Sequence, residues 1–250
     1  TVVASYRCRR SSRWRHHCWP QIETLFSSAQ LSSAQLGSVV VTTSGILLAG
    51  GASRRFPPNK LATELDGVPL FWHALRALGA ASSEVVVAIG RGGDELPLPA
   101  LGVPVRFCRD RMVGAGPLAG LAAGLDACTG DWAVVVAGDM PWVPTSLLVA
   151  MRDRAVATGT ATTALLEQGR VRPLPCVLFV ASARAVVAGL VARGERRLRT
   201  IVETPGTEAL PEDWWRPHDG RAGWLRDVDR LEDLAGGPSA AASRQSQIRS

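Results

Sequence analysis

The chain has 250 residues, of which 46% are hydrophobic, so it can bury the core of one large α/β domain or two small ones. It contains no run of about eighteen apolar residues, which argues against a membrane-spanning helix and a membrane partner. The net charge of +6 comes from the two ends of the chain. Residues 45–235 hold 21 basic and 21 acidic side chains, so we expect no nucleic-acid partner.

The two ends differ in composition from the region between them. Residues 1–44 hold five arginines, many serines and one acidic residue, and residues 236–250 are rich in alanine, glycine and serine. We expect a disordered or mis-assigned leader over 1–44, with a transit peptide as the alternative, and a disordered tail over 236–250. The five cysteines form no CxxC pair, which fits reduced thiols in a cytoplasmic protein.

Short apolar runs alternate with helical patterns between these ends. The first expected elements are a strand over 45–49 and a helix over 69–78 that ends at Gly79. There follow strands 84–89 and 103–108, helix 116–128, strand 132–137, helix 144–157, strands 160–166 and 174–180, and helices 183–193 and 196–203. The pattern indicates a Rossmann-like α/β fold over 45–235: a mostly parallel sheet with helices on both faces, in a three-layer sandwich. Such sheets bind ligands at the carboxyl ends of their strands.

The first predicted strand runs into a glycine pair and basic residues, in LAGGASRRFPPNK. Gly50 and Gly51 allow the backbone to approach a phosphate chain, and exposed N–H groups there can bind an anion. Lys60 is the only lysine among the 28 basic residues, which suggests a role for its compact ammonium that arginine does not fill. Lys60 and Arg55 would place positive charge beside the phosphates. The stretch matches neither a Walker loop nor GxGxxG, and a plain strand-to-helix turn is the structural alternative.

Carboxylates follow the buried strand over 132–137 and recur near the end of the domain. Asp139, in GDMP, would stand at the carboxyl end of a central strand, where it can hold Mg²⁺ over bound phosphates. In Asp227-Val228-Asp229, strand alternation would put both carboxylates on one face, with Asp229 as the second metal ligand. Capping of a turn or helix is the alternative role for each of these acids.

A further glycine-rich stretch, GAGPLAGL, opens the helix predicted over 116–128. The N-terminus of that helix can face a nucleotide. Close helix packing through small residues is the alternative, and both can hold together.

In combination the motifs resemble the molybdenum cofactor guanylyltransferases, within the wider MobA-like nucleotidyltransferase group. The resemblance runs from about Gly45 to Leu234, and it includes the Arg172-Pro173 segment, GERR at 194–197 and DVDRLEDL. It implies a fold of the nucleotide-diphospho-sugar transferase type. It also implies a Mg²⁺-dependent enzyme that joins GMP from GTP to molybdopterin and releases pyrophosphate.

Site residues follow from the resemblance at matching positions. The implied nucleotide-binding residues are Leu48, Ala49, Gly50, Gly51, Ser53, Lys60, Asp110, Gly116, Pro117 and Leu118. Lys60, Arg55 and Asp139 would be catalytic, with Asp139 and Asp229 as metal ligands. The attacking phosphate of the acceptor is already ionised, so no general base is needed. We expect Lys60 and Asp139 to converge on one triphosphate, in a monomer or weak homo-oligomer.

The sequence departs from the family pattern in several places, and two of them bear on the phosphate and metal sites. Pro57 and Pro58 supply no N–H donors to the loop before Lys60, and Asp227 and Asp229 stand where the family commonly has Asn. Three other functions therefore stay open. They are a related cytidylyltransferase or sugar-phosphate nucleotidyltransferase, a catalytically silent nucleotide-binding protein and, most weakly, a Rossmann-type dehydrogenase, for which GxGxxG is lacking.

Overall fold

The computed structural model describes residues 41–50, 60–91, 93–110, 116–218 and 228. Its large sheet consists of β1 (Thr43–Leu48), β4 (Glu84–Ile89), β5 (Val105–Arg109), β6 (Trp132–Ala137), β7 (Thr162–Glu167), β8 (Arg170–Phe179) and β9 (Thr207–Leu210). A separate hairpin consists of β2 (Glu64–Leu65) and β3 (Val68–Pro69). The helices are η1 (Lys60–Ala62), α2 (Leu70–Ala81), α3 (Pro117–Ala127), α4 (Thr145–Thr158), α5 (Val180–Ala192), α6 (Arg199–Val202), α7 (Glu212–Trp215) and η2 (Arg216–His218).

The strand order of the large sheet is β5-β4-β1-β6-β8-β7-β9. The first four of these strands are parallel to one another, and β7 is parallel to β9. Strand β8 is antiparallel to both β6 and β7. The sequence prediction of a mostly parallel sheet is therefore confirmed. Strands β1 and β4 are buried along their whole length, which explains why they read as continuous apolar runs.

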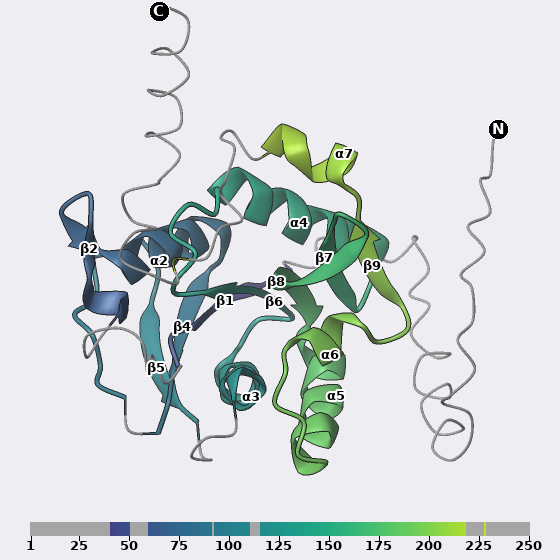
Figure 1. Ribbon diagram of the computed structural model, residues 1–250, viewed down its shortest axis with the longest axis horizontal. Helices are drawn as coiled ribbons and strands as arrows, with labels where there is room; N and C mark the ends of the chain where they lie inside the picture. The colour runs from purple at the N-terminus through teal and green to yellow at the C-terminus, as the bar shows by residue number, and fades with distance from the viewer. Residues whose placement is uncertain (1–40, 51–59, 92, 111–115, 219–227, 229–250) are drawn as a thin grey trace, which may run out of the picture. The chain divides into compact units, whose positions relative to one another are not determined.

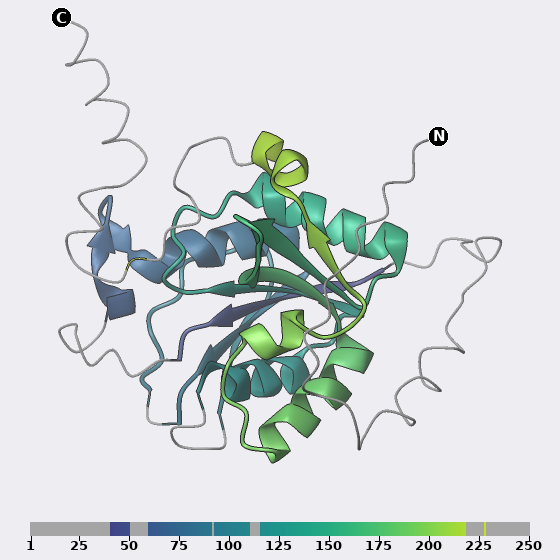
Figure 2. The same cartoon turned by 45° about the vertical axis from the view of Figure 1, so that its right-hand side comes forward.

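Helices cover both faces of the sheet (Figure 1). Helices α2 and α4 pack together on one face, and α3 and α5 pack together on the other. The turned view in Figure 2 shows the same three layers, with α2 and α4 above the sheet and α3 and α5 below it. Among the described residues, none of the helices has the length and apolar character required to cross a bilayer.

Three of the expected element boundaries that differ from the structure have a local explanation. Helix α2 continues past Gly79, whose missing side chain makes room for Leu101: a Cβ on Gly79 would lie 3.2 Å from Leu101 Cδ1. Strand β8 begins at Arg170 instead of Leu174, because its polar first half pairs with β7. Strand β1 begins at Thr43, before the expected domain start at residue 45.

The helix expected over 196–203 is reduced to α6. The carboxylate of Glu195 accepts hydrogen bonds from the backbone N–H groups of Arg196 (2.8 Å) and Arg197 (3.0 Å). It also accepts hydrogen bonds from the Arg197 guanidinium at 3.0–3.1 Å. These bonds hold Arg196 and Arg197 in a turn, so the helix begins only at Arg199.

Candidate active site

The carboxyl ends of the parallel strands meet at one edge of the sheet. Strand β1 ends at Leu48, and the Ala49 N–H donates to Ala88 O of the neighbouring β4 at 2.8 Å. A Cβ on Gly50 would lie 3.1 Å from the backbone nitrogen of Gly90, so the close approach of these two chains favours glycine at position 50. Leu48, Ala49 and Gly50 thus lie together at the edge where the sequence placed a phosphate site. Gly51, Ser53 and Arg55 lie outside the described residues.

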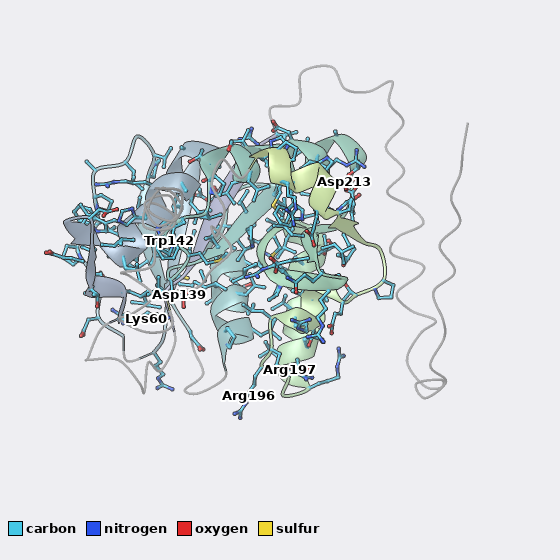
Figure 3. All side chains as sticks on the ribbon, turned by 45° about the horizontal axis from the view of Figure 1, so that its top comes forward. Lys60, Asp139, Trp142, Arg196, Arg197 and Asp213 are labelled. Carbon is cyan, nitrogen blue, oxygen red and sulfur yellow. The ribbon has the colours of Figure 1, made fainter. Side chains whose placement is uncertain are left out.

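Lys60 and Asp139 come together at this edge, as the sequence analysis expected. Lys60 Nζ donates to Asp139 Oδ2 at 2.9 Å, although the two residues are 79 positions apart in the chain. Lys60 is 8% exposed, whereas the Asp139 side chain is 29% exposed. Figure 3 shows the two side chains close to each other, with Trp142 near Asp139. The geometry therefore places an ammonium and a partly exposed carboxylate within one small region.

Contacts between neighbouring segments fix the positions of Lys60 and Asp139 relative to each other. Leu61, next to Lys60, covers the turn before Asp139: a Cβ on Gly138 would lie 3.1 Å from Leu61 Cδ2. The Gly138 N–H donates to Leu48 O at 3.0 Å, which joins that turn to the end of β1. Glycine at position 138 thus lets η1, which carries the lysine, pack directly on the turn that carries the carboxylate.

The last described residue, Val228, docks beside Asp139. Its N–H donates to Asp139 O at 3.0 Å, and its side chain is fully buried in a cluster with Leu65, Leu70 and Trp142. Val228 is not in a strand, although the sequence analysis expected one there. Asp229 lies outside the described residues, so its role as second metal ligand stays a prediction.

The remaining predicted nucleotide-binding residues lie at the ends of β5 and α3. Asp110 follows β5, is 9% exposed and donates its N–H to Ile89 O at 3.0 Å. Gly116 has φ +79°, and a Cβ there would lie 2.9 Å from the carbonyl oxygen of Arg196. The Leu118 N–H donates to that same oxygen at 3.2 Å, and the Leu118 side chain is fully buried. Close packing therefore accounts for this glycine, while contact of Gly116, Pro117 and Leu118 with a nucleotide stays a prediction.

A cavity of about 630 Å³ reaches Ala137 and Met140, which flank Gly138 and Asp139 in the sequence, and the sequence analysis did not identify it. Its lining comes from the end of β6, the β7–β8 hairpin and α6: Ala137, Met140, Glu167, Gln168, Arg170, Val171, Arg172, Pro173, Leu174 and Arg199. Three arginines and one glutamate give it a net positive charge, and Arg172 Nη1 contacts Glu167 Oε2 at 2.8 Å. The alternation of Arg170 and Arg172 in one strand was the available signal. The third arginine belongs to another element, so only the fold brings it near.

The donor set of the site fits a hard divalent cation that is held in part by substrate. Among the described residues, no group of three or more His, Cys, Asp or Glu side chains could hold a metal ion by itself. The carboxylate of Asp139 is partly exposed, and carboxylate oxygen is a preferred ligand of Mg²⁺. Mg²⁺ commonly keeps few protein ligands and completes its octahedron with substrate phosphates and water. Asp139 can therefore hold such an ion only together with substrate phosphates that supply further ligands.

Two solved structures illustrate the fold that this chain shares. The fold is similar to that of molybdopterin-guanine dinucleotide biosynthesis protein A from Archaeoglobus fulgidus, with a TM-score of 0.63 and 20% identity over 80% of this chain and 99% of that chain. It is also similar to 2-C-methyl-D-erythritol 4-phosphate cytidylyltransferase from Thermus thermophilus, with a TM-score of 0.54 and 19% identity over 79% and 98% of the two chains. At these identities the likeness shows the fold alone, an α/β sandwich with a mostly parallel sheet.

Sequence comparison gives the family. The model of the MobA-like NTP transferase domain matches residues 45–210, so this chain belongs to the MobA-like NTP transferase family. A "Probable molybdenum cofactor guanylyltransferase" from Chloroflexus aggregans is 33% identical over 200 residues, which cover 76% of this chain and 91% of the relative. A relative of the same name from Mycobacterium bovis is 35% identical over 175 residues, which cover 68% and 84%.

Proposed function

We propose that this chain transfers the guanylyl group of GTP to molybdopterin and releases pyrophosphate. The observation that carries the proposal is the 2.9 Å pair of Lys60 Nζ and Asp139 Oδ2 at the carboxyl edge of the sheet. Relatives that bear the guanylyltransferase name support the choice of GTP and molybdopterin. Free thiols at Cys108, Cys128 and Cys176 are in keeping with a cytoplasmic enzyme.

The chemistry is an in-line substitution at the α-phosphorus of the triphosphate. A terminal phosphate oxygen of the acceptor forms the new bond to this phosphorus, and the bond to the bridging oxygen of the β-phosphate breaks. Pyrophosphate leaves with that oxygen. The ammonium of Lys60 stabilises the negative charge that gathers on the phosphates, with Arg55 as a second predicted contributor. The nucleophile is already ionised near pH 7, so no side chain has to remove a proton.

Asp139, with Asp229 as its predicted partner, would hold a Mg²⁺ ion. When bound, this ion would supply positive charge that offsets the negative charge of the triphosphate. Lys60 and Asp139 would then orient the same triphosphate from two sides. Leu48, Ala49 and Gly50 would support it from the end of β1.

The cavity that reaches Ala137 and Met140 would hold the acceptor. Its volume of about 630 Å³ lies within the usual range for small-molecule sites. Ala137 and Met140, which flank the turn of Asp139 in sequence, form one side of the cavity. Arg170 and Arg199 would attract a phosphorylated acceptor there, because guanidinium groups form strong charge-assisted hydrogen bonds with phosphate oxygens.

The reaction can be tested by measuring pyrophosphate release with GTP, CTP, ATP and UTP, each with and without molybdopterin. We expect release with GTP that depends on molybdopterin and on Mg²⁺. Preference for CTP or for a sugar phosphate would favour the cytidylyltransferase alternative. Binding of GTP without release of pyrophosphate under any condition would identify a silent nucleotide-binding protein.

Replacing Arg199 by glutamine should weaken binding of the acceptor and leave binding of GTP unchanged. We expect the KM for molybdopterin to rise about tenfold, which corresponds to the loss of one charge-assisted hydrogen bond of about 1.4 kcal/mol. The KM for GTP and kcat should change little, because Arg199 lines the cavity whereas Lys60 is not among its lining residues. Steady-state kinetics with each substrate varied in turn measures the difference. Arg193→Gln, an exposed position outside the cavity, is the matched control; an equal effect there would contradict the assignment of Arg199.

A further inference from the structure

Main-chain hydrogen bonds around Lys60, in addition to its ion pair, keep this residue close to Asp139. The Lys60 carbonyl oxygen accepts the Thr63 N–H at 3.2 Å, and the Thr63 carbonyl oxygen accepts the Leu70 N–H at 2.8 Å. Leu61 packs directly on Gly138. These contacts join the lysine to the start of α2 and to the turn of Asp139. The ammonium can therefore change its partner by side-chain rotation, but it stays within reach of the carboxylate.

Asp139 is fixed from its own side. Its carbonyl oxygen accepts the Val228 N–H at 3.0 Å, and the neighbouring Met140 N–H donates to Ala137 O at 3.2 Å. The turn is thus anchored both to the end of β6 and to Val228. Main-chain hydrogen bonds thus tie both partners of the ion pair to neighbouring parts of the fold.

We propose that Lys60 is the resident counter-ion of Asp139 and opposes binding of a free divalent cation, so that the metal ion binds together with the triphosphate. This inference depends on the proposed role of Asp139 as metal ligand. A divalent cation on Asp139 would lie within a few ångströms of the buried ammonium, and two positive charges at that distance repel each other strongly in a partly buried site. The phosphates of the nucleotide remove this conflict, because they accept the ammonium and supply additional ligands to the metal.

The proposal gives Lys60 two effects of opposite sign. Removal of its charge should impair the reaction, since the phosphates lose a cationic partner. The same change should improve the binding of a metal ion in the absence of nucleotide, since the carboxylate loses its competitor. A lysine that acts only on the phosphates would produce the first effect without the second.

The test is the binding of Mn²⁺ alone to the full chain, followed by electron paramagnetic resonance without nucleotide. For Lys60→Met we expect a Kd for Mn²⁺ at least about tenfold lower than for the wild type. Arg193→Met removes one positive charge away from the site and should leave the Kd within about twofold. Lys60→Gln provides a second uncharged variant if Lys60→Met does not fold, as judged by circular dichroism. Adding Asp139→Asn to the uncharged variant should abolish the gain.

Two results would overturn the proposal. One is an uncharged Lys60 variant that binds Mn²⁺ no more tightly than the wild type, including no measurable binding by either. The other is a gain that survives Asp139→Asn, because the ion would then bind elsewhere. Neither result concerns transfer of the guanylyl group, which the measurement of pyrophosphate release tests separately.

Discussion

Replacement of Lys60 by methionine is expected to lower kcat for pyrophosphate release by about 10²–10³-fold. Methionine keeps much of the length and apolar volume of lysine but has no charge. The ammonium of Lys60 is proposed to stabilise negative charge that develops as the α-phosphorus is attacked. An interaction that strengthens in the transition state affects kcat as well as kcat/KM. Initial rates at saturating GTP and molybdopterin measure the loss.

Two further variants test whether the loss of turnover is specific to the ammonium of Lys60. Lys60→Arg should stay at least about tenfold impaired, because a wide planar guanidinium does not reproduce a compact ammonium in a position that is only 8% exposed. Arg154→Met removes an exposed arginine whose partner is Glu208, at 2.6 Å, and should keep normal activity. A folded Lys60→Met protein with turnover within about threefold of the wild type would exclude the assigned role of Lys60.

Glu84→Gln is expected to lower the free energy of unfolding by about 3 kcal/mol. Glu84 is 6% exposed and starts β4, at the edge of the sheet opposite to the candidate site. Its carboxylate accepts hydrogen bonds from Ser44 Oγ at 2.6 Å, the Thr129 N–H at 2.8 Å and Arg106 Nη1 at 2.7 Å. Urea unfolding at pH 7 measures the change. Turnover at temperatures where the variant is folded should stay near normal.

The same carboxylate makes stability depend on pH. Burial alone raises the pKa of Glu84, but the hydrogen bonds from Ser44, Thr129 and Arg106 outweigh it and lower the pKa from its ordinary 4.5 to about 2. Because the folded-state pKa is the lower one, this stabilisation is complete above about pH 4.5 and is lost as the pH falls towards 2. The Glu84→Gln protein should lack this part of the acid dependence.

A matched control separates this network from ordinary surface charge. The carboxylate of Glu95 is 53% exposed and contacts Arg109 at 3.1 Å. Glu95→Gln should change stability by less than about 0.5 kcal/mol. Equal destabilisation by the two substitutions would show that the buried contacts of Glu84 contribute nothing beyond its charge.

The sequence predicts best where one physical signal decides the structure. Strands β4 and β6 begin and end at the predicted residues, because continuous apolar runs between polar turns admit few other structures. The pairing of Lys60 with Asp139 was also predicted, since parallel strands that alternate with helices bring their carboxyl ends to one edge. The order of strands and helices along the chain therefore predicts which edge of the sheet holds the candidate site.

The cavity beside the site was harder to predict. The first half of β8 alternates arginine with smaller residues, so periodicity alone does not distinguish it from a loop. Arg199 reaches the cavity because Glu195 holds the preceding residues in a turn, and no periodic pattern encodes that contact. Short elements such as α6 and β9 derive their structure from tertiary packing, and their own propensities do not specify it.

Strand β8 runs antiparallel to β6. The cavity lined by Arg170 and Arg172 can therefore vary independently of the edge that holds Lys60 and Asp139. A parallel strand in its place would bring its carboxyl end to this edge, whereas β8 brings its beginning, with Arg170 and Arg172, next to the end of β6. The turn between β7 and β8 can therefore change in length or sequence while β5, β4 and β1 keep the same register. A change in that hairpin would thus alter the cavity while it leaves the edge that holds Lys60 and Asp139 unchanged.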